Sequence, residues 1–430
     1  MGGAALTADQ AAPTRIKSRH VAAAVVGNAL EFYDFTTFAL FATQVGRAFF
    51  PSHDPFVSLM ASLATFWLGF VGRPIGAVVL GRIADRVGRK PALLLSFSLM
   101  GAGLIGLSLI PPYAKIGVLA PVLAVSCRLL QGFALGGEVG PTMAYLIEAA
   151  PAGKRGLYGS WQSASQSIAS LTGAFVGVAL SDLLTVQQFD DWGWRAAFLI
   201  GALVLPFGLI VRGTLPETLH HAETSLETHP ERADLSSHTR IIVLGVLMIM
   251  SFTTSTYVMS YMTTYALHTL HMPADVSFGA SVVNGAVGIV FTLLGGFLSD
   301  RYGRKLVMLA PRVLFLLVTL PGFYLIVRNH DAVTLFTATG VIGALSSLST
   351  GAALISLTEG IRKEVRGLAV GGIYAIAVTV FGGATQFIIT GLIHVTGNPL
   401  APAYYMAATS LIGIVAMAMM RETVVLAKRA

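Results

Sequence analysis

Charged residues are scarce in this chain, at 11% of 430 residues, whereas 54% are hydrophobic and the mean hydropathy is +0.73. Soluble domains usually carry about 25% charged residues, so the composition excludes an ordinary soluble protein. Apolar runs such as residues 92–110 are long enough to cross a bilayer, since one helical span takes about 20 apolar residues. These runs are continuous rather than alternating, which excludes a membrane β-barrel. The sequence therefore predicts an all-α membrane protein.

Cysteine is nearly absent as well. The single cysteine, Cys127, lies within an apolar run, so a disulfide framework and a cysteine-based metal site are excluded. The histidine pair His268 and His271 falls in an expected loop without acidic partners, and we predict no metal site. No phosphate-binding glycine loop is present, which argues against an ATP-driven pump, and no cofactor is expected beyond a coupling ion, either a proton or sodium.

What the chain has instead is a series of twelve expected spans, divided into two groups of six by the polar stretch 214–239. This stretch has almost no apolar periodicity and is expected to be a cytoplasmic linker. We expect an N-terminal bundle at 20–213, a C-terminal bundle at 240–421, and tails at 1–19 and 422–430. The expected spans are 20–47, 57–81, 91–111, 116–147, 156–182, 193–213, 240–268, 276–298, 306–327, 332–358, 366–394 and 402–421.

Positive charge is distributed unevenly between the loops of this topology. Most of the 28 lysines and arginines fall on the side that holds both tails and the linker. Because cytoplasmic loops of membrane proteins carry an excess of Lys and Arg, both termini are expected in the cytoplasm. The net charge of +7 is thereby explained without a nucleic-acid partner.

The two halves repeat each other. GRIADRVGRK at 81–90 returns as GFLSDRYGRK at 296–305, half a chain length later. A second signature recurs at nearly the same period, since Glu148 precedes Arg155 by the same spacing as Glu359 precedes Arg366. Duplicated six-helix units with a substrate site between them are a transporter architecture. We therefore predict a carrier built from two pseudo-repeats.

The repeated charged phrases are predicted to form a cytoplasmic gate. Their carboxylates can accept hydrogen bonds from a neighbouring helix N-terminus or from nearby arginines, and their glycines allow close helix approach. Such a cluster suits a switch that forms and breaks, whereas plain membrane anchoring, the alternative, explains only the Lys and Arg. The predicted gate residues are Gly81, Asp85, Arg86, Gly88, Arg89, Glu148, Arg155, Asp300, Arg301, Gly303, Arg304, Glu359 and Arg366.

These phrases resemble signatures of the major facilitator superfamily, as do RLLQGFALGGE at 128–138 and LPET at 215–218. Within it, GNALEFYDF (27–35), GFVGRPIGAVVLG (69–81) and SWQSASQ (160–166) resemble the metabolite:proton symporter family, nearest to its citrate and tricarballylate carriers. The resemblance implies the twelve-helix major facilitator fold and uptake of a small organic acid or osmolyte together with protons. It also implies a multi-pass protein of a bacterial-type inner membrane, and we expect a monomer.

Ionisable residues inside spans are functional candidates, because an unpaired charge in hydrocarbon is costly. Asn28, Glu31 and Asp34 recur every three residues and share a face of the first helix. By resemblance, Asp34 pairs with Arg128 of the fourth span for proton coupling, and Glu31 is the rival proton carrier. A static ion pair is the alternative. Arg128 could also hold a substrate carboxylate, since guanidinium suits bidentate recognition.

Polar side chains on other spans are candidates for substrate binding. Gln162 and Gln166 point the same way on the fifth span, with interhelical hydrogen bonding as the alternative. A tyrosine on every turn of the seventh span predicts a phenol stripe facing a cavity, with plain packing as the alternative. The predicted substrate-binding residues are Asn28, Arg73, Arg128, Gln162, Gln166, Tyr257, Tyr261, Tyr265 and Tyr374. Arg312, at the start of the ninth span, is expected to reach the cytoplasmic interface.

The sequence thus predicts a proton-coupled symporter that imports a small organic acid, a citrate-like di- or tricarboxylate, by alternating access. One alternative is a proton-driven exporter or antiporter of amphiphilic compounds, which would have a larger and more apolar cavity. Another is a symporter for a zwitterionic osmolyte or a different organic acid. An enzyme is not expected, because the 214–239 stretch is the longest polar segment and no nucleophile–base set is apparent. The expected partners are a small organic anion and the lipid bilayer.

Overall fold

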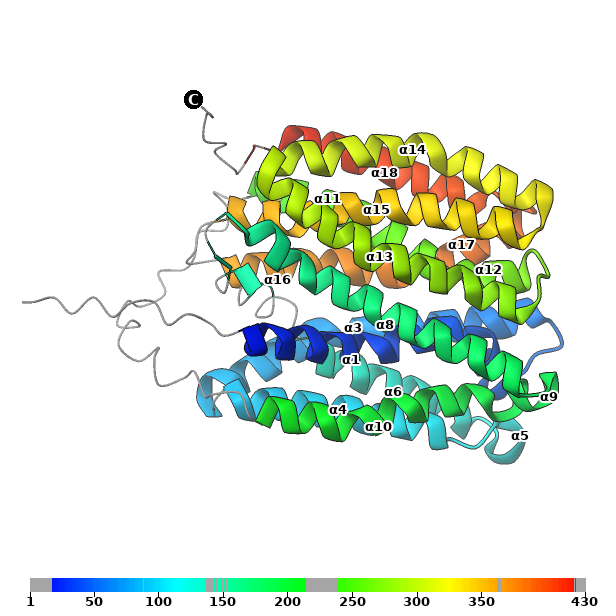
Figure 1. The fold of residues 1–430 in the computed structure, drawn as a ribbon. Helices are drawn as coiled ribbons and strands as arrows, with labels where there is room; N and C mark the ends of the chain where they lie inside the picture. Colours follow the sequence, from blue (N-terminus) through cyan, green and yellow to red (C-terminus); the bar gives the residue numbers. More distant parts are fainter. Residues whose placement is uncertain are drawn as a thin grey trace, which may run out of the picture.

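The computed structural model describes residues 18–87, 89–136, 143, 146–147, 150–151, 153–213, 239–361, 366–420 and 422. These residues form a bundle of long, roughly parallel helices without strands (Figure 1). Its first half comprises α1 (Ser18–Leu40), α2 (Ala42–Phe49), α3 (Pro55–Val87), α4 (Arg89–Leu109), α5 (Tyr113–Ile116), α6 (Leu119–Leu135), α8 (Arg155–Leu183), α9 (Val186–Gln188), the π-helical turn η1 (Phe189–Gly193) and α10 (Trp194–Gly213). The second half comprises α11 (Thr239–Ser260), α12 (Met262–His268), α13 (Ala274–Tyr302), α14 (Arg304–Asn329), α15 (Ala332–Gly360), α16 (Arg366–Ala377), the π-helical turn η4 (Val378–Gly382), α17 (Gly383–Thr396) and α18 (Ala401–Met419).

Each expected span coincides with a helix or with consecutive helical segments. The first and seventh spans each comprise two helical segments, which meet at Phe41 between α1 and α2 and at Tyr261 between α11 and α12, and helical hydrogen bonds continue across both residues. The eleventh contains the η4 turn, a local change of winding that is frequent at functional sites. The expected linker lies almost wholly outside the described residues, as do most of both tails.

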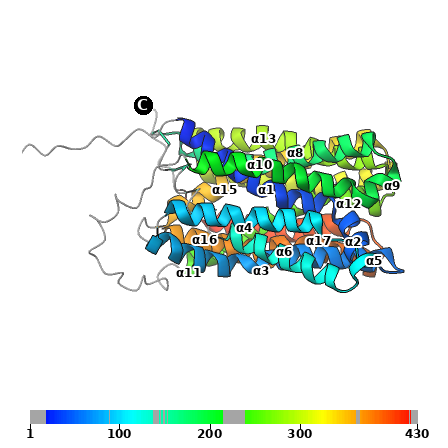
Figure 2. The ribbon, with the colours of Figure 1, turned by 90° about the horizontal axis from the view of Figure 1, so that it is seen from below.

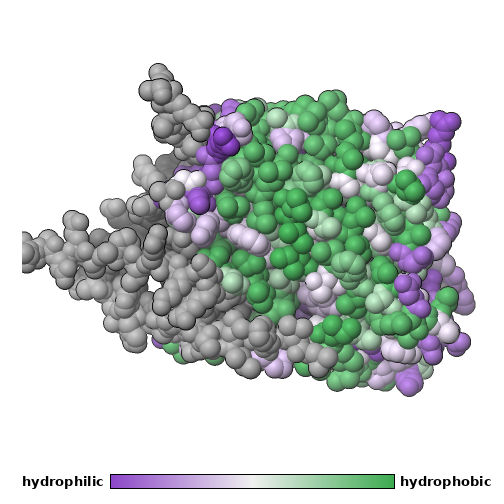
Figure 3. All heavy atoms as spheres, viewed as in Figure 1, coloured by the Kyte–Doolittle hydropathy of each residue, from purple (hydrophilic) through white to green (hydrophobic). Residues whose placement is uncertain are grey.

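The helices carry an apolar belt around the bundle. Eight described helices are long and apolar enough to cross a bilayer, and shorter apolar helices accompany them. A green apolar band separates purple hydrophilic ends in the space-filling view (Figure 3). The first described residues of α1 and the end of α18 lie at the same end of the molecule (Figure 1). The predicted all-α membrane fold with both chain ends on one side is therefore confirmed.

Within the first half, α4 lies between α6 and α10 (Figure 2). Helix α3 packs on α6 so closely that a Cβ atom on Gly132 would overlap the carbonyl oxygen of Gly69. Small residues are favoured at such membrane interfaces because they let helix backbones approach. This contact fixes the position of Arg128 along the bundle axis relative to α3, because Arg128 lies one turn before Gly132 on α6.

The two halves meet along α8 and α13, which run side by side over much of their length (Figure 1). At one end Gly156 and Gly296 leave no room for a Cβ atom. Near the middle, a Cβ on Gly288 would lie 2.6 Å from the Ser167 hydroxyl. Glycines therefore bring the two halves into close contact along this seam, which leads directly to the central cavity.

Candidate transport site

A closed set of polar contacts joins α1 to α6. The carboxylate of Asp34 lies 3.2 Å from Nη1 of Arg128 and accepts a hydrogen bond of 3.1 Å from Nε2 of Gln131. Arg128 also donates to Oε1 of Gln131 at 2.7 Å. Asp34 is 1% exposed and Arg128 is 0% exposed. The structure thus brings together the acid and the arginine that the sequence pairs, and it adds a glutamine that holds both.

Aromatic rings surround this ion pair. The Arg128 guanidinium carbon lies 4.4 Å from the ring centre of Phe35 and 4.5 Å from that of Phe38. Arg73, also buried, lies 4.7 Å from the Phe35 ring centre and 4.2 Å from that of Phe70. Two guanidinium groups therefore share the Phe35 ring, and cation–π attraction offsets part of the cost of burying them.

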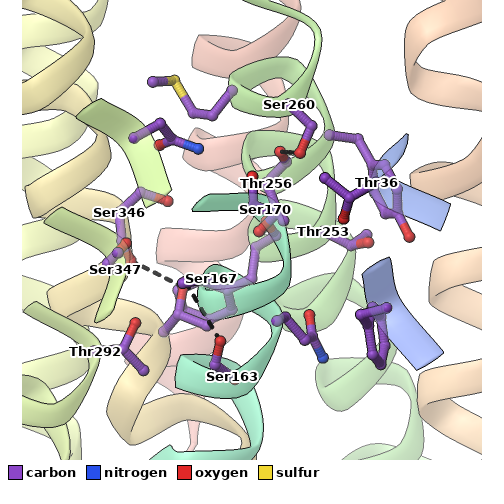
Figure 4. A pocket seen from close by; sticks show the side chains of 18 of the residues that line it. Thr36, Ser163, Ser167, Ser170, Thr253, Thr256, Ser260, Thr292, Ser346 and Ser347 are labelled. Carbon is purple, nitrogen blue, oxygen red and sulfur yellow. Dashed lines mark hydrogen bonds between the residues drawn. The ribbon is translucent and has the colours of Figure 1, made fainter. Parts of the chain in front are cut away.

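A central cavity of about 140 Å³ lies beside this cluster, and both halves of the chain line it. Phe35 and Phe66 form part of its wall, together with the side chains of Gln162, Gln166, Tyr257 and Tyr374. Several serine and threonine hydroxyls surround the remainder (Figure 4). A water molecule needs roughly 10–15 Å³ on this scale, so a small organic molecule fits the space.

The predicted substrate residues divide into those that line the cavity and those that do not. Gln162 and Gln166 both face it from α8, and Tyr257 and Tyr374 face it from the second half. Arg128 and Arg73 stand behind the rings of Phe35, Phe66 and Phe70 rather than on the wall. Arg73 nevertheless reaches the cavity indirectly, because it lies over the ring of Phe70, whose centre is 5.5 Å from that of Tyr257.

Asn28 supports the site without lining it. Its amide donates to the backbone oxygen of Gln162 at 3.2 Å and to the Ser165 hydroxyl at 2.6 Å. These contacts connect α1 to α8 and fix the turn that carries Gln162. Glu31 is also buried on α1, at 2% exposure, one turn before Asp34.

The expected tyrosine stripe does not form one surface. Helical hydrogen bonds continue through Tyr261, whose N–H donates to the Tyr257 carbonyl at 3.0 Å and whose carbonyl accepts from the Tyr265 N–H at 2.8 Å, but the three phenols have different surroundings. Only Tyr257 lines the central cavity. The Tyr261 oxygen accepts a hydrogen bond from Thr390 at 2.7 Å, and Tyr265 donates to the Pro399 carbonyl at 2.7 Å. Tyr261 and Tyr265 therefore lie away from the central cavity, and Tyr261 borders a separate pocket beside Thr390.

The expectation for Arg312 is wrong. Its side chain is 0% exposed and turns inward from α14 instead of reaching the interface. It donates to the Ser251 carbonyl at 2.5 Å and to the hydroxyls of Ser251 and Ser255 at 2.7 and 2.6 Å. The signal that sequence reasoning missed is the pair of serines spaced one turn apart on α11, which supplies the polar contacts.

At the cytoplasmic end, Asp300 of α13 caps the first turn of α8. Its two oxygens accept hydrogen bonds from the backbone N–H groups of Gly156 at 2.7 Å and Leu157 at 2.9 Å. The partial positive charge of a helix N-terminus favours a carboxylate there. Arg304 extends the cluster, since it bonds Asp300 at 2.8 Å and Glu359 through two bonds of 3.1 Å. The expected contacts of the second charged phrase are thus present.

The other predicted gate residues show a less symmetrical arrangement. Among the described residues, no neighbouring atom lies within 4 Å of a Cβ placed on Gly81, whereas Gly296 packs closely on Gly156. Gly303 adopts φ +95 between α13 and α14, a conformation that favours glycine. Arg86, Arg155 and Arg301 are exposed. The remaining predicted gate residues lie outside what the structure describes: residues Gly88 and Glu148, and the side chains of Asp85, Arg89 and Arg366.

The family of this chain follows from comparisons with known proteins. The model of the "sugar (and other) transporter" family matches residues 20–234 and 220–427. The chain belongs to that family. This transporter is 36% identical over 397 residues to a citrate-proton symporter of Klebsiella pneumoniae, covering 91% of this chain and 88% of the relative. It is 30% identical over 419 residues to a proline/betaine transporter of Escherichia coli, covering 94% and 83%.

Solved structures match the fold of this transporter. A D-xylose-proton symporter superimposes with a TM-score of 0.77 at 18% identity, covering 94% of this chain and 98% of that one. An inward open xylose transporter from E. coli gives a TM-score of 0.73 at 16% identity, covering 94% and 96%. The predicted major facilitator fold is confirmed, and the chain is a multi-pass membrane transporter and not an enzyme.

Proposed function

We propose that this transporter is a proton-coupled symporter that imports a small organic acid, a di- or tricarboxylate of citrate-like size. The observation that carries the proposal is the buried Asp34–Arg128 pair, which lies directly behind the aromatic wall of the central cavity. The 36% identity to a citrate-proton symporter supports the class of substrate.

The chemistry of coupling rests on one carboxylate. A nearby guanidinium favours ionised Asp34, whereas a dry environment favours the protonated form. If the halves move apart on alternate sides, water reaches the pair from one side at a time, so Asp34 takes up a proton outside and releases it inside. Protonation removes the partner charge of Arg128, and the guanidinium is then available to a substrate carboxylate across Phe35.

The proposed cytoplasmic gate is the contact of Asp300 with the first turn of α8. It joins the second half of the chain to the first, and Arg304 holds the carboxylate in place from behind. Opening toward the cytoplasm requires these hydrogen bonds to break. A ring of charge-assisted bonds at the membrane edge, where water can replace them, is suited to such reversible closure.

The proposal is tested by uptake into proteoliposomes. Citrate, tricarballylate, 2-oxoglutarate, shikimate and betaine are compared with and without an inward proton gradient, in wild-type protein and in Asp34→Asn. We expect gradient-driven accumulation of an acid that is lost in Asp34→Asn and kept in Asp182→Asn, an exposed acid near the far end of α8. Glu31→Gln, run in parallel, decides between the two candidate proton carriers. Equal accumulation with and without the proton gradient would refute the coupling mechanism.

A symporter for a zwitterionic osmolyte is the second candidate. Among the described residues that line the cavity none is charged, which suits a solute without net charge. Proline/betaine transporters also match over most of the chain. Uptake of betaine alone in the same panel would favour this candidate over an organic acid.

A further inference from the structure

One side of the central cavity is formed by hydroxyl groups from three helices. Ser163 and Ser167 come from α8, Thr292 from α13, and Ser346 and Ser347 from α15, and they gather on one side of the pocket in Figure 4. Thr350 of α15 also lines the cavity. We call these six residues the hydroxyl wall. The aromatic wall with Tyr257 and Tyr374 completes the cavity.

Several protons of the hydroxyl wall are already engaged in the protein. Ser167 donates to the Ser163 carbonyl at 3.4 Å, and Thr350 donates to the Ser346 carbonyl at 2.8 Å. Ser163 donates to Oε1 of Gln162 at 3.3 Å. A hydroxyl whose proton is engaged offers only its oxygen lone pairs. Ser163, Ser167 and Thr350 therefore present acceptors to whatever occupies the cavity, and an ionised carboxylate is a poor ligand for acceptors.

One of the amides that line the cavity, that of Gln162, supplies a matching donor. Gln162 lines the cavity, is 1% exposed, and has its oxygen held by Ser163. Its Nε2 is buried and has no hydrogen-bond partner among the described residues. A buried donor without a partner costs about 1–3 kcal/mol, so a ligand that accepts this hydrogen bond gains from it.

We propose that the hydroxyl wall and Gln162 bind an alcohol group of the substrate, which makes the substrate a hydroxy acid. An alcohol accepts one hydrogen bond and donates one, and this matches a free N–H beside hydroxyl oxygens. The carboxylate of the same molecule then lies toward the phenols of Tyr257 and Tyr374. A deoxy acid offers no donor to the hydroxyl oxygens of the wall, and sites built for a hydroxyl discriminate strongly against analogues that lack it.

This inference rests on the proposed transport of an organic acid, but its test does not need a gradient. Binding of matched pairs is measured by thermal stabilisation of the purified protein in detergent: citrate against tricarballylate, and malate against succinate. Each pair differs by one hydroxyl. We expect the hydroxy acid of the better-bound pair to bind at least tenfold more tightly. Gln162→Leu and Ser167→Ala should bring that ratio toward one by weakening only the hydroxy acid.

The matched control is Ser181→Ala, which removes a half-buried hydroxyl from the same helix beyond the cavity lining. Equal binding of hydroxy and deoxy acids by the wild type would overturn the inference, as would equal weakening of both by the two variants. The inference would also be overturned if the protein bound proline but none of the four carboxylic acids, because the hydroxyl oxygens of the wall would then accept hydrogen bonds from an ammonium group. Tight and selective binding without proton-driven uptake would instead refute only the coupling mechanism.

Discussion

Asp300 and Gly156 belong to opposite halves of the chain, yet the carboxylate of one accepts the backbone N–H of the other at 2.7 Å. A second bond, from the N–H of Leu157, makes the contact a helix cap shared between two bundles. Substitutions of the side chains at Gly156 and Leu157 leave the two backbone N–H donors in place. The contact is therefore tested by substituting Asp300, which supplies the acceptor.

Asp300→Asn is therefore expected to loosen the cytoplasmic seam. The amide keeps the shape but loses the charge, and a hydrogen bond to a charged group contributes about 1.5–3 kcal/mol. We expect about tenfold faster thiol labelling from the cytoplasmic side at Ser347→Cys, in a Cys127→Ser background. Arg301→Gln, an exposed neighbour, is the control. Unchanged labelling in Asp300→Asn would show that the cap does not hold the seam closed.

Arg304 and Glu359 are expected to depend on each other. Two parallel bonds of 3.1 Å join them, and their side chains are 3% and 14% exposed. Breaking one partner of a mostly buried pair leaves the other charge poorly compensated. In a double-mutant cycle with Arg304→Gln and Glu359→Gln, thermal unfolding should give a coupling energy of about 1–3 kcal/mol. Simple additivity of the two effects would contradict a direct interaction.

The three tyrosines of the seventh span should behave differently from one another. Tyr257→Phe removes a phenol oxygen from the cavity wall, so we expect KM for the transported acid to rise about tenfold. Tyr261 and Tyr265 bond elsewhere in the second half and do not line the central cavity, so their Phe variants serve as matched controls. An equal rise of KM in all three variants would contradict this difference and would favour the predicted stripe of three substrate-binding phenols.

Arg312 is expected to stabilise the contact between α11 and α14. Its planar guanidinium bonds Ser251 and Ser255 at once, and lysine cannot reproduce that geometry. Arg312→Lys should lower the free energy of unfolding by about 1–3 kcal/mol, measured by thermal unfolding in detergent. Arg312→Met tests whether the charge itself matters. If the lysine variant is as stable as the wild type, the serine contacts contribute little.

Sequence reasoning succeeded where a local pattern determines the outcome. Apolar run length located the spans, and the half-chain repeat pointed to Asp300 with its helix cap. The pairing of Asp34 with Arg128 came from resemblance, and the structure places the two side chains in contact. The roles assigned to them remain proposals.

The sequence-based predictions failed where packing between distant helices determines the direction and the partners of a side chain. Tyr261 and Tyr265 bond to Thr390 and Pro399, and the regular spacing of the three tyrosines gives no sign of these distant partners. The direction of Arg312 depends on serines some 60 residues earlier in the chain. The screening of Arg73 and Arg128 by Phe35 likewise follows from tertiary packing alone. Ser163 and Ser167, one turn apart beside the two glutamines, were the available signal for the hydroxyl wall.

The Asp34–Arg128 contact also bears on how the protein enters the membrane during synthesis. An arginine at the centre of an isolated span costs roughly 2.5–3.5 kcal/mol to insert. The acid that compensates it lies in a helix that leaves the ribosome earlier, so the first span is already present to receive the fourth. We therefore expect the first span to promote membrane insertion of the fourth. An insertion assay of residues 116–147, with and without 20–47 ahead of them, should show more efficient integration when the first span precedes.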